Sequence, residues 1–210
     1  MTTLSEIGDK YGARKNTHVT FGKTLLDIYQ SYFDFPFQMQ SQSKAINLLE
    51  IGVLDGASLL TWQEYFKNAN IYGIDIKVPE INSERIKIFQ ADQGDVRDLE
   101  RVYRQINEKL DIIIDDGSHV NEYTLTAFNF FWNKLNSGGL YIIEDTICTY
   151  DKASYDWPGM YLNKSEINLN NNRKDIDNFL LGHVTRMDFD QSDIFFIHIY
   201  RNLIIIKKAD

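Results

Sequence analysis

The 210-residue chain has little cysteine and little proline: one cysteine, Cys148, and three prolines. A single cysteine excludes a disulfide within the chain and excludes zinc sites built from several thiolates, and it is typical of a reducing, cytoplasmic location. No apolar run approaches the roughly 18 residues that a membrane helix needs. The N-terminus also lacks the basic and apolar pattern of a signal peptide. We therefore expect no membrane partner.

Basic residues are the minority among the charged ones, with 22 Lys and Arg against 30 Asp and Glu and a formal net charge of -8. A nucleic-acid binder usually shows a basic face, so this balance argues against a nucleic-acid partner. Hydrophobic residues make up 43% and charged residues 25%, which is ordinary for a globular protein. We expect a single domain over residues 1–210, in which residues 1–40 form an N-terminal arm and a helix.

Apolar runs alternate with segments of helical periodicity through most of the chain. Strands are expected at 46–51, 71–76, 86–89, 111–114 and 140–143, and helices at 24–33, 58–66, 95–109, 122–135 and 175–182. Residues 137–139, Ser-Gly-Gly, are expected to end the helix 122–135 as a glycine C-cap. Strands that alternate with helices indicate a parallel sheet with crossover helices.

The C-terminal part of the chain has a different pattern. Residues 146–172 are irregular and rich in aromatic and Asn residues, which is typical of a lid or substrate loop. Residues 193–200 and 203–207 flank Arg201-Asn202 and predict an antiparallel hairpin. The expected fold class is therefore α/β: a Rossmann-like, doubly wound, mostly parallel seven-stranded sheet closed by a terminal antiparallel hairpin.

A glycine turn joins the first of these strands to the following helix. Gly52 and Gly56 allow the backbone to turn tightly and to approach a ligand closely. Asp75, at the end of the next strand, can accept both ribose hydroxyls of a nucleoside. Leu54 stands where the NAD fingerprint needs its middle glycine, and Glu50 would repel a pyrophosphate. The turn therefore favours S-adenosylmethionine over NAD. The expected cofactor-binding residues are Glu50, Gly52, Gly56, Ser58, Asp75, Asp92, Gln93 and Asp115, with Asp92 and Gln93 toward the adenine and Asp115 toward the methionine amino group.

Two further strands each end in a pair of acids, Asp115-Asp116 and Glu144-Asp145. Because these strands are neighbours, their carboxyl ends open on the same crevice, and Asp116, Glu144 and Asp145 can converge. Three crowded carboxylates repel one another unless they are protonated or neutralised by a cation. Hard oxygen ligands favour Mg²⁺, with Mn²⁺ or Ca²⁺ as alternatives. A metal site is therefore expected at these three residues.

His119 follows the first acid pair by three residues and is the best candidate for a general base, because imidazole takes a hydroxyl proton near neutral pH. We expect His119 and Asp116 to be catalytic. The competing interpretation is that Asp116 or Ser118 caps the next helix and that His119 lies on the surface. The second acid pair, at the next strand end, favours the catalytic interpretation.

These residues resemble the macrolide and aminocoumarin sugar O-methyltransferases, a metal-dependent branch of the class I S-adenosylmethionine-dependent methyltransferases. The resemblance implies O-methylation of a sugar hydroxyl, with Asp116, Glu144 and Asp145 as metal ligands, His119 as base and His18 on the substrate side. The matching pieces are residues 49–53, 56–59, 72–76, 113–119 and 139–146, with Trp62, Asp9-Lys10 and His18.

Three other interpretations stay open. The same fold and cofactor serve a methyltransferase for catechol-like phenols, because a metal ion chelates adjacent hydroxyls in both acceptors. A non-catalytic S-adenosylmethionine-binding accessory protein would bind the cofactor without metal dependence. A dehydrogenase fits least well. The expected partner is a small-molecule sugar or glycoside acceptor, and the chain leaves a homo-oligomer open.

Overall fold

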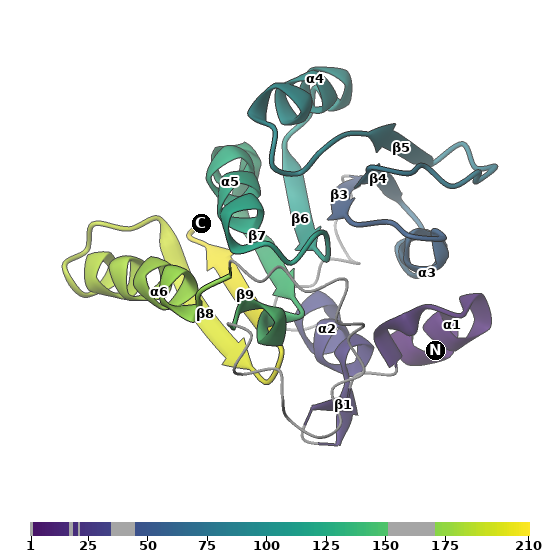
Figure 1. Ribbon diagram of the computed structural model, residues 1–210. Coiled ribbons are helices and arrows are strands. Elements are labelled where there is room, and N and C mark those ends of the chain that lie inside the picture. The colour runs from purple at the N-terminus through teal and green to yellow at the C-terminus, as the bar shows by residue number, and fades with distance from the viewer. Residues whose placement is uncertain (1, 17–18, 21, 35–44, 151–170) are drawn as a thin grey trace.

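The computed structural model describes residues 2–16, 19–20, 22–34, 45–150 and 171–210. Its centre is a seven-stranded sheet with the order β5-β4-β3-β6-β7-β9-β8 (Figure 1). The first five strands in this order are parallel, and β9 is antiparallel to both of its neighbours. The expected fold class is confirmed. The strands are β3 (Ile46–Ile51), β4 (Ala69–Asp75), β5 (Ile86–Gln90), β6 (Leu110–Asp115), β7 (Leu135–Glu144), β8 (Ile194–Tyr200) and β9 (Leu203–Lys208).

Helices cover both faces of the sheet, in three layers (Figure 1). Strand residues alternate between the two faces, so that Leu48 and Ile112 belong to one core while Leu49 and Ile113 belong to the other. Central strands buried on both faces read as continuous apolar runs, which is why the sequence predicts them well. The first face carries α1 (Leu4–Tyr11), α2 (Leu25–Asp34) and α3 (Ala57–Tyr65), and the second carries α4 (Val96–Ile106), α5 (Asn121–Phe131) and α6 (Arg173–Asp188).

The chain reverses its direction of progress through the sheet between β3 and β6. From β3 it proceeds outward to β4 and β5, and it then returns to place β6 on the other side of β3. Ligands of open α/β sheets bind in the crevice outside the carboxyl ends of the strands at such a switch point. The glycine turn follows β3 and the first acid pair ends β6, so both border this crevice.

Several helix ends differ from the sequence expectation, most clearly those of α5 and α6. The glycine C-cap expected at residues 137–139 is wrong: α5 ends at Phe131, a 3-10 helix η3 (Trp132–Lys134) follows, and β7 already begins at Leu135. Leu135 is held in the sheet by pairing with Leu110, and this pairing across strands outweighs the local glycine signal. Helix α6 also extends further than the expected 175–182.

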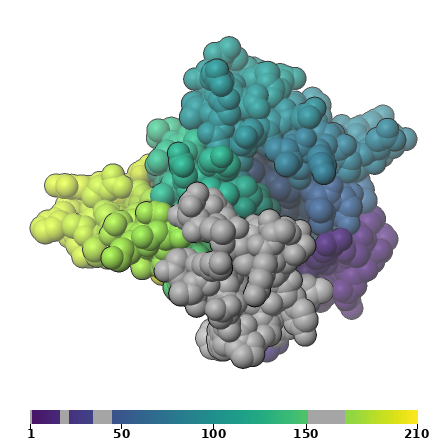
Figure 2. All heavy atoms as spheres, in the orientation of Figure 1, coloured from purple at the N-terminus to yellow at the C-terminus, as the bar shows by residue number. Residues whose placement is uncertain are grey.

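The N-terminal arm holds more structure than its polar sequence suggests. Helix α1 begins with a capping box in which Thr3 and Glu6 bond each other's backbone. A 3-10 helix η1 (Arg14–Asn16) and a small hairpin, β1 (Val19–Thr20) with β2 (Lys23–Thr24), connect α1 to α2. Figure 2 shows the purple N-terminal residues lying directly against the blue part of the chain that contains α3.

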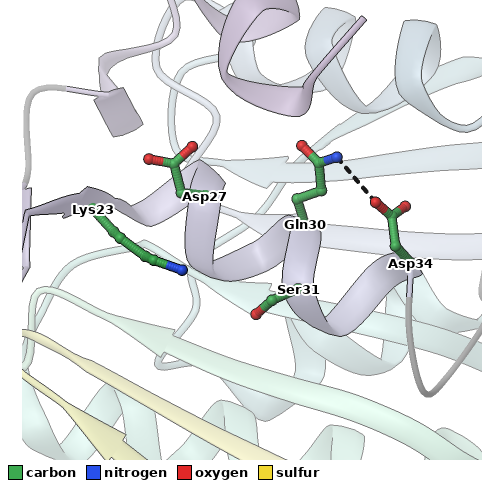
Figure 3. A pocket seen from close by; sticks show the side chains of 5 residues that line it. All are labelled: Lys23, Asp27, Gln30, Ser31 and Asp34. Atoms are coloured by element: carbon green, nitrogen blue, oxygen red, sulfur yellow. Dashed lines mark hydrogen bonds between the residues drawn. The ribbon is translucent and has the colours of Figure 1, made fainter. Parts of the chain in front are cut away.

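Among the described residues, no helix combines the length and the apolar character needed to cross a bilayer. The centre of the expected substrate loop, 151–170, and His18 lie outside the described residues. A depression of about 480 Å³ lies on α2 and is lined by Lys23, Asp27, Gln30, Ser31 and Asp34 (Figure 3). Four of the five lining side chains are already hydrogen-bonded, for example Gln30 Nε2 to Asp34 Oδ2 at 2.9 Å, and none of the five belongs to the site expected from the sequence.

Candidate active site

The loop after β6 passes directly over the glycine turn after β3. The amide of Asp116 donates to the Ile51 carbonyl at 2.9 Å. Gly52 has φ +87°, and a Cβ at this position would lie only 2.0 Å from the Asp116 carbonyl oxygen. Glycine is therefore required here both for its backbone conformation and for its missing side chain. This packing brings the acids of β6 beside the turn.

Two acids brace the glycine turn from different sides. Asp75 Oδ2 accepts hydrogen bonds from the amides of Val53 at 2.7 Å and Leu54 at 3.0 Å. Glu50 is completely buried below the turn, where its Oε2 accepts from Ser58 Oγ at 2.7 Å and from Trp62 Nε1 at 2.9 Å. The expected cofactor residues Glu50 and Ser58 thus bond to each other, while Asp75 lies partly exposed at the crevice.

A second contact at this edge of the sheet joins Gln93, in the loop after β5, to Asp115, the last residue of β6. Gln93 Nε2 donates to Asp115 Oδ1 at 2.6 Å, and Gln93 Oε1 accepts from the Ser118 amide at 3.0 Å. Burial raises the pKa of Asp115 to about 7. Asp92 is exposed and accepts from the Gly94 amide at 2.8 Å. The structure therefore brings Gln93 and Asp115 into contact and leaves the Asp92 side chain exposed to solvent.

Asp116, His119 and Asp145 form a cluster that we name the outer group. His119 Nε2 lies 3.6 Å from Asp145 Oδ2 and 3.9 Å from Asp116 Oδ1, and each of the three side chains is partly exposed. His119 and Asp145 have positive φ angles of 54° and 49°. Such angles are unfavourable for residues with a side chain and tend to occur at functional sites. The outer group is thus a partly open site made of a histidine and two carboxylates.

Glu50, Asp116 and Glu144 form a second cluster, the inner group, which shares Asp116 with the outer group. Its three carboxylates surround the ammonium group of Lys15, which lies 2.6 Å from Glu144, 2.8 Å from Asp116 and 3.0 Å from Glu50. Tyr29, on α2, donates to the same Glu144 oxygen at 2.5 Å.

Two residues that contact the inner group, Lys15 and Tyr29, were missed by sequence reasoning. The signal that was available is the acid cluster itself, since converging carboxylates require a cation. Burial opposes the charged form of Lys15, but the three carboxylates outweigh it and hold the pKa of Lys15 well above its ordinary value. Burial and the nearby Asp116 raise the pKa of Glu144 to about 8 against the opposing effect of Lys15.

Asp145 accepts a hydrogen bond from a residue near the C-terminus, Asn202. Asn202, in the turn of the hairpin β8–β9, donates its side-chain amide to Asp145 Oδ1 at 2.5 Å and accepts from the Ile147 amide at 3.0 Å. The three expected metal ligands therefore each have one oxygen fixed by a protein donor: Asp116 Oδ2, Glu144 Oε1 and Asp145 Oδ1.

The structure divides the three expected metal ligands between the two groups: Glu144 belongs to the inner group, Asp145 to the outer group and Asp116 to both. The chemistry of this donor set nevertheless fits a hard divalent cation. The other oxygens of these carboxylates, Asp116 Oδ1, Glu144 Oε2 and Asp145 Oδ2, are not used in the contacts with Lys15, Tyr29 and Asn202. If ionised, Glu50 and these three acids carry four negative charges against the one positive charge of Lys15. Oxygen ligands and an excess of negative charge match the preferences of Mg²⁺.

The sheet order, the glycine turn at the switch point and the acids beside it together define the class I methyltransferase fold. The solved structure of the MycE methyltransferase from the mycinamycin biosynthetic pathway, in complex with Mg, SAH and mycinamycin VI, shares this fold with a TM-score of 0.76 and 28% identity, over 98% of this chain. An O-methyltransferase family protein from Burkholderia thailandensis, at 11% identity and a TM-score of 0.54 over 98% of this chain and 60% of its own, shares the fold alone. No protein-family model matches the chain.

Curated relatives narrow this class. The chain is 34% identical over 164 residues, 74% of its length, to mycinamicin VI 2''-O-methyltransferase from Micromonospora griseorubida. It is 36% identical over 143 residues, 64% of its length, to 8-demethyl-8-alpha-L-rhamnosyl tetracenomycin-C 2'-O-methyltransferase from Streptomyces olivaceus. The resemblance to the macrolide sugar O-methyltransferases is confirmed. The matches cover 37% and 35% of these two relatives, and 54% of the MycE chain, so this chain spans about a third to a half of the proteins it matches.

Proposed function

We propose that this chain is an S-adenosylmethionine-dependent O-methyltransferase that acts, with the help of Mg²⁺, on a hydroxyl group of a sugar or glycosylated small molecule. The observation that carries the proposal is the outer group: a histidine lies within 4 Å of two carboxylates, next to the glycine turn. The relatives named above methylate sugars, which favours a sugar over a catechol-like phenol.

The cofactor would lie against the glycine turn. We assign its binding to Glu50, Gly52, Gly56, Ser58, Asp75, Asp92, Gln93 and Asp115. When bound, S-adenosylmethionine supplies a methyl group on a positively charged sulfur. A region rich in carboxylates suits such a ligand, and the partly exposed Asp75 suits its ribose. The buried Glu50 would act indirectly, because its carboxylate fixes the side chain of Ser58 at the start of α3.

His119 would take the proton of the acceptor hydroxyl at its Nε2 atom. The carboxylates of Asp116 and Asp145 lie within 4 Å of this atom, so the base stands beside two of the assigned metal ligands. We assign Asp116, Glu144 and Asp145 as the ligands of Mg²⁺, which supplies chelation of the acceptor's oxygens and lowers the pKa of a hydroxyl. Asp116 thus belongs to both the metal site and the catalytic pair.

The acceptor and the setting of the reaction belong to the same proposal. We infer a small-molecule glycoside acceptor and no nucleic-acid partner, since the chain is acidic. We place the reaction in the cytoplasm, because the single cysteine, buried and not in a disulfide, fits a reducing compartment.

Calorimetric titration with S-adenosylhomocysteine, with and without Mg²⁺, tests the cofactor assignment. We expect micromolar binding in both conditions. Transfer of labelled methyl groups to glycosides should then require Mg²⁺ and stop with EDTA, and Glu144→Gln should abolish transfer while leaving S-adenosylhomocysteine binding nearly unchanged. Binding of NADH in place of S-adenosylhomocysteine, or transfer that survives EDTA, would contradict the proposal.

A further inference from the structure

Lys15 is buried, which is unusual for a lysine, and packing alone does not explain its position. Its side chain is only 6% exposed, and its ammonium group lies within 3.0 Å of three carboxylates from three different strand ends. Those carboxylates, Glu50, Asp116 and Glu144, are close enough to one another to hold a metal ion by themselves. Lys15 is therefore where a cation bound to the inner group would lie.

Three other side chains donate hydrogen bonds to the inner group, and all three are neutral. Tyr29 donates to Glu144, and Ser58 and Trp62 donate to the second oxygen of Glu50. None of these donors adds positive charge, whereas the ammonium of Lys15 contacts all three carboxylates and balances part of their charge. Three carboxylates at this spacing cannot all stay ionised without such a balance.

Lys15 binds only one oxygen of Asp116 and one of Glu144, so the other carboxylate oxygen of each residue remains for a second cation. It binds Asp116 through Oδ2 and Glu144 through Oε1. Asp116 Oδ1 lies on the side of His119, and Glu144 Oε2 takes no part in these contacts. Carboxylates that are each shared between two cations are the usual bridging ligands of two-metal sites, in which the ions lie about 3.5–4 Å apart.

We propose that Lys15 is a built-in cation that takes the place of a second metal ion, so that the four acids hold one permanent and one exchangeable positive charge. The permanent charge is Lys15 in the inner group. The exchangeable one is the divalent ion that the proposed function assigns to Asp116, Glu144 and Asp145, and in this respect the inference rests on that function. Lys15 is then a positioning residue, because it holds one oxygen of each of two assigned ligands and leaves the other oxygen to the exchangeable ion.

The number of Mn²⁺ ions bound per chain tests this inference without any measurement of activity. Free Mn²⁺ is followed by electron paramagnetic resonance during titration of the full chain, as wild type, Lys15→Ala and Lys10→Ala. We expect one ion per wild-type chain and two per Lys15→Ala chain. Lys10 is the matched control, since it is exposed in the same arm and pairs with Glu64 on the surface, and Lys10→Ala should bind one ion. A folded Lys15→Ala chain that binds one ion overturns the inference.

Removal of a buried charge can also prevent folding, and a second variant covers that case. Without divalent ions, Lys15→Ala should lower Tm by roughly 10 °C or more, because breaking a buried ion pair leaves unbalanced charge. Millimolar Mn²⁺ should restore Tm, and so should Glu50→Gln in the same chain, which removes one of the three carboxylates. Lys15→Ala/Glu50→Gln should bind one ion only. If neither Mn²⁺ nor Glu50→Gln restores folding, Lys15 does not act as a replaceable cation.

The same titration separates this inference from the proposed function. A wild-type chain that binds no Mn²⁺ would contradict the proposed metal dependence. If Lys15→Ala then bound one ion, Lys15 would still be shown to occupy a cation position. One ion bound by both wild type and folded Lys15→Ala would leave the proposed function intact and remove the inference.

Discussion

The side-chain amide of Asn202 lies 2.5 Å from Asp145 Oδ1, although the two residues are 57 positions apart in the sequence. The antiparallel pairing of Glu144 with Leu203 brings the hairpin turn to the end of β7 and so makes this contact possible. Asn202 also accepts from the Ile147 amide, so one side chain fixes both a candidate metal ligand and the backbone that follows it.

This contact predicts a metal-site role for Asn202. Its φ is +66°, so Asn202→Gly removes the side chain without straining the backbone. We expect Asn202→Gly to weaken Mn²⁺ binding roughly 10–100-fold, as is typical when a hydrogen-bond partner of a metal ligand is removed. Metal titration and circular dichroism measure the affinity and the folding. Asn107→Gly, at another positive-φ position, after α4, is the control and should leave the affinity unchanged. Equal affinity for the Asn202 variant would remove this role.

His119 carries the second prediction. His119→Ala should lower turnover by roughly 10²–10⁴-fold, because a general base contributes about that factor. The affinity for S-adenosylhomocysteine should stay within about twofold, since the His119 imidazole lies against Asp116 and Asp145, which are assigned to the metal ion. Single-turnover methyl transfer and calorimetry measure the two effects. His183→Gln, on α6 against Phe128, is the control histidine. Turnover of His119→Ala at the control level would show that another group takes the proton.

The fold could be predicted from the sequence because its strong signals are local. The runs 46–51 and 111–114 carry apolar residues on both faces, as central parallel strands do, and these runs became β3 and β6. The convergence of Asp116 and Glu144 in the inner group follows from the parallel pairing of β6 with β7. The glycine C-cap at 137–139 failed because pairing between Leu135 and Leu110 is a contact that local pattern does not contain.

The partners of the acids could not be predicted in this way. Lys15 is 101 residues from Asp116 and 129 from Glu144, and nothing in the polar arm marks this lysine as buried. Tyr29 looks like any aromatic residue on the packed face of a helix. Which hydroxyl and which ammonium reach a carboxylate depends on how α1, η1 and α2 pack on the sheet, and this is decided by tertiary contacts.

Asp75 should affect both cofactor affinity and the stability of the turn. It accepts from the amides of Val53 and Leu54, and it is the acid proposed for the ribose. We expect Asp75→Asn to weaken S-adenosylhomocysteine binding by roughly tenfold, about 1.4 kcal/mol, and to lower the free energy of unfolding by about 1 kcal/mol. Calorimetry and urea denaturation measure these two quantities. Glu100→Gln, an exposed acid on α4, should change neither. A loss of stability with unchanged affinity would restrict Asp75 to bracing the turn.

Among the glycines, Gly52 is the one at which we expect substitution to lower the stability of the fold most. Gly182, in α6, is the matched control. A Cβ at Gly52 would lie 2.0 Å from the Asp116 carbonyl oxygen, and the φ of +87° strains any other residue. We expect Gly52→Ala to lower the free energy of unfolding by about 3 kcal/mol or more. Gly182 has nothing within 4 Å of the corresponding Cβ position, so Gly182→Ala should raise it by about 0.5–1 kcal/mol. Urea denaturation compares both with wild type. Equal stability of the two variants would mean that the loop of Asp116 can move away from the turn, and the outer group would then not be held beside the cofactor site.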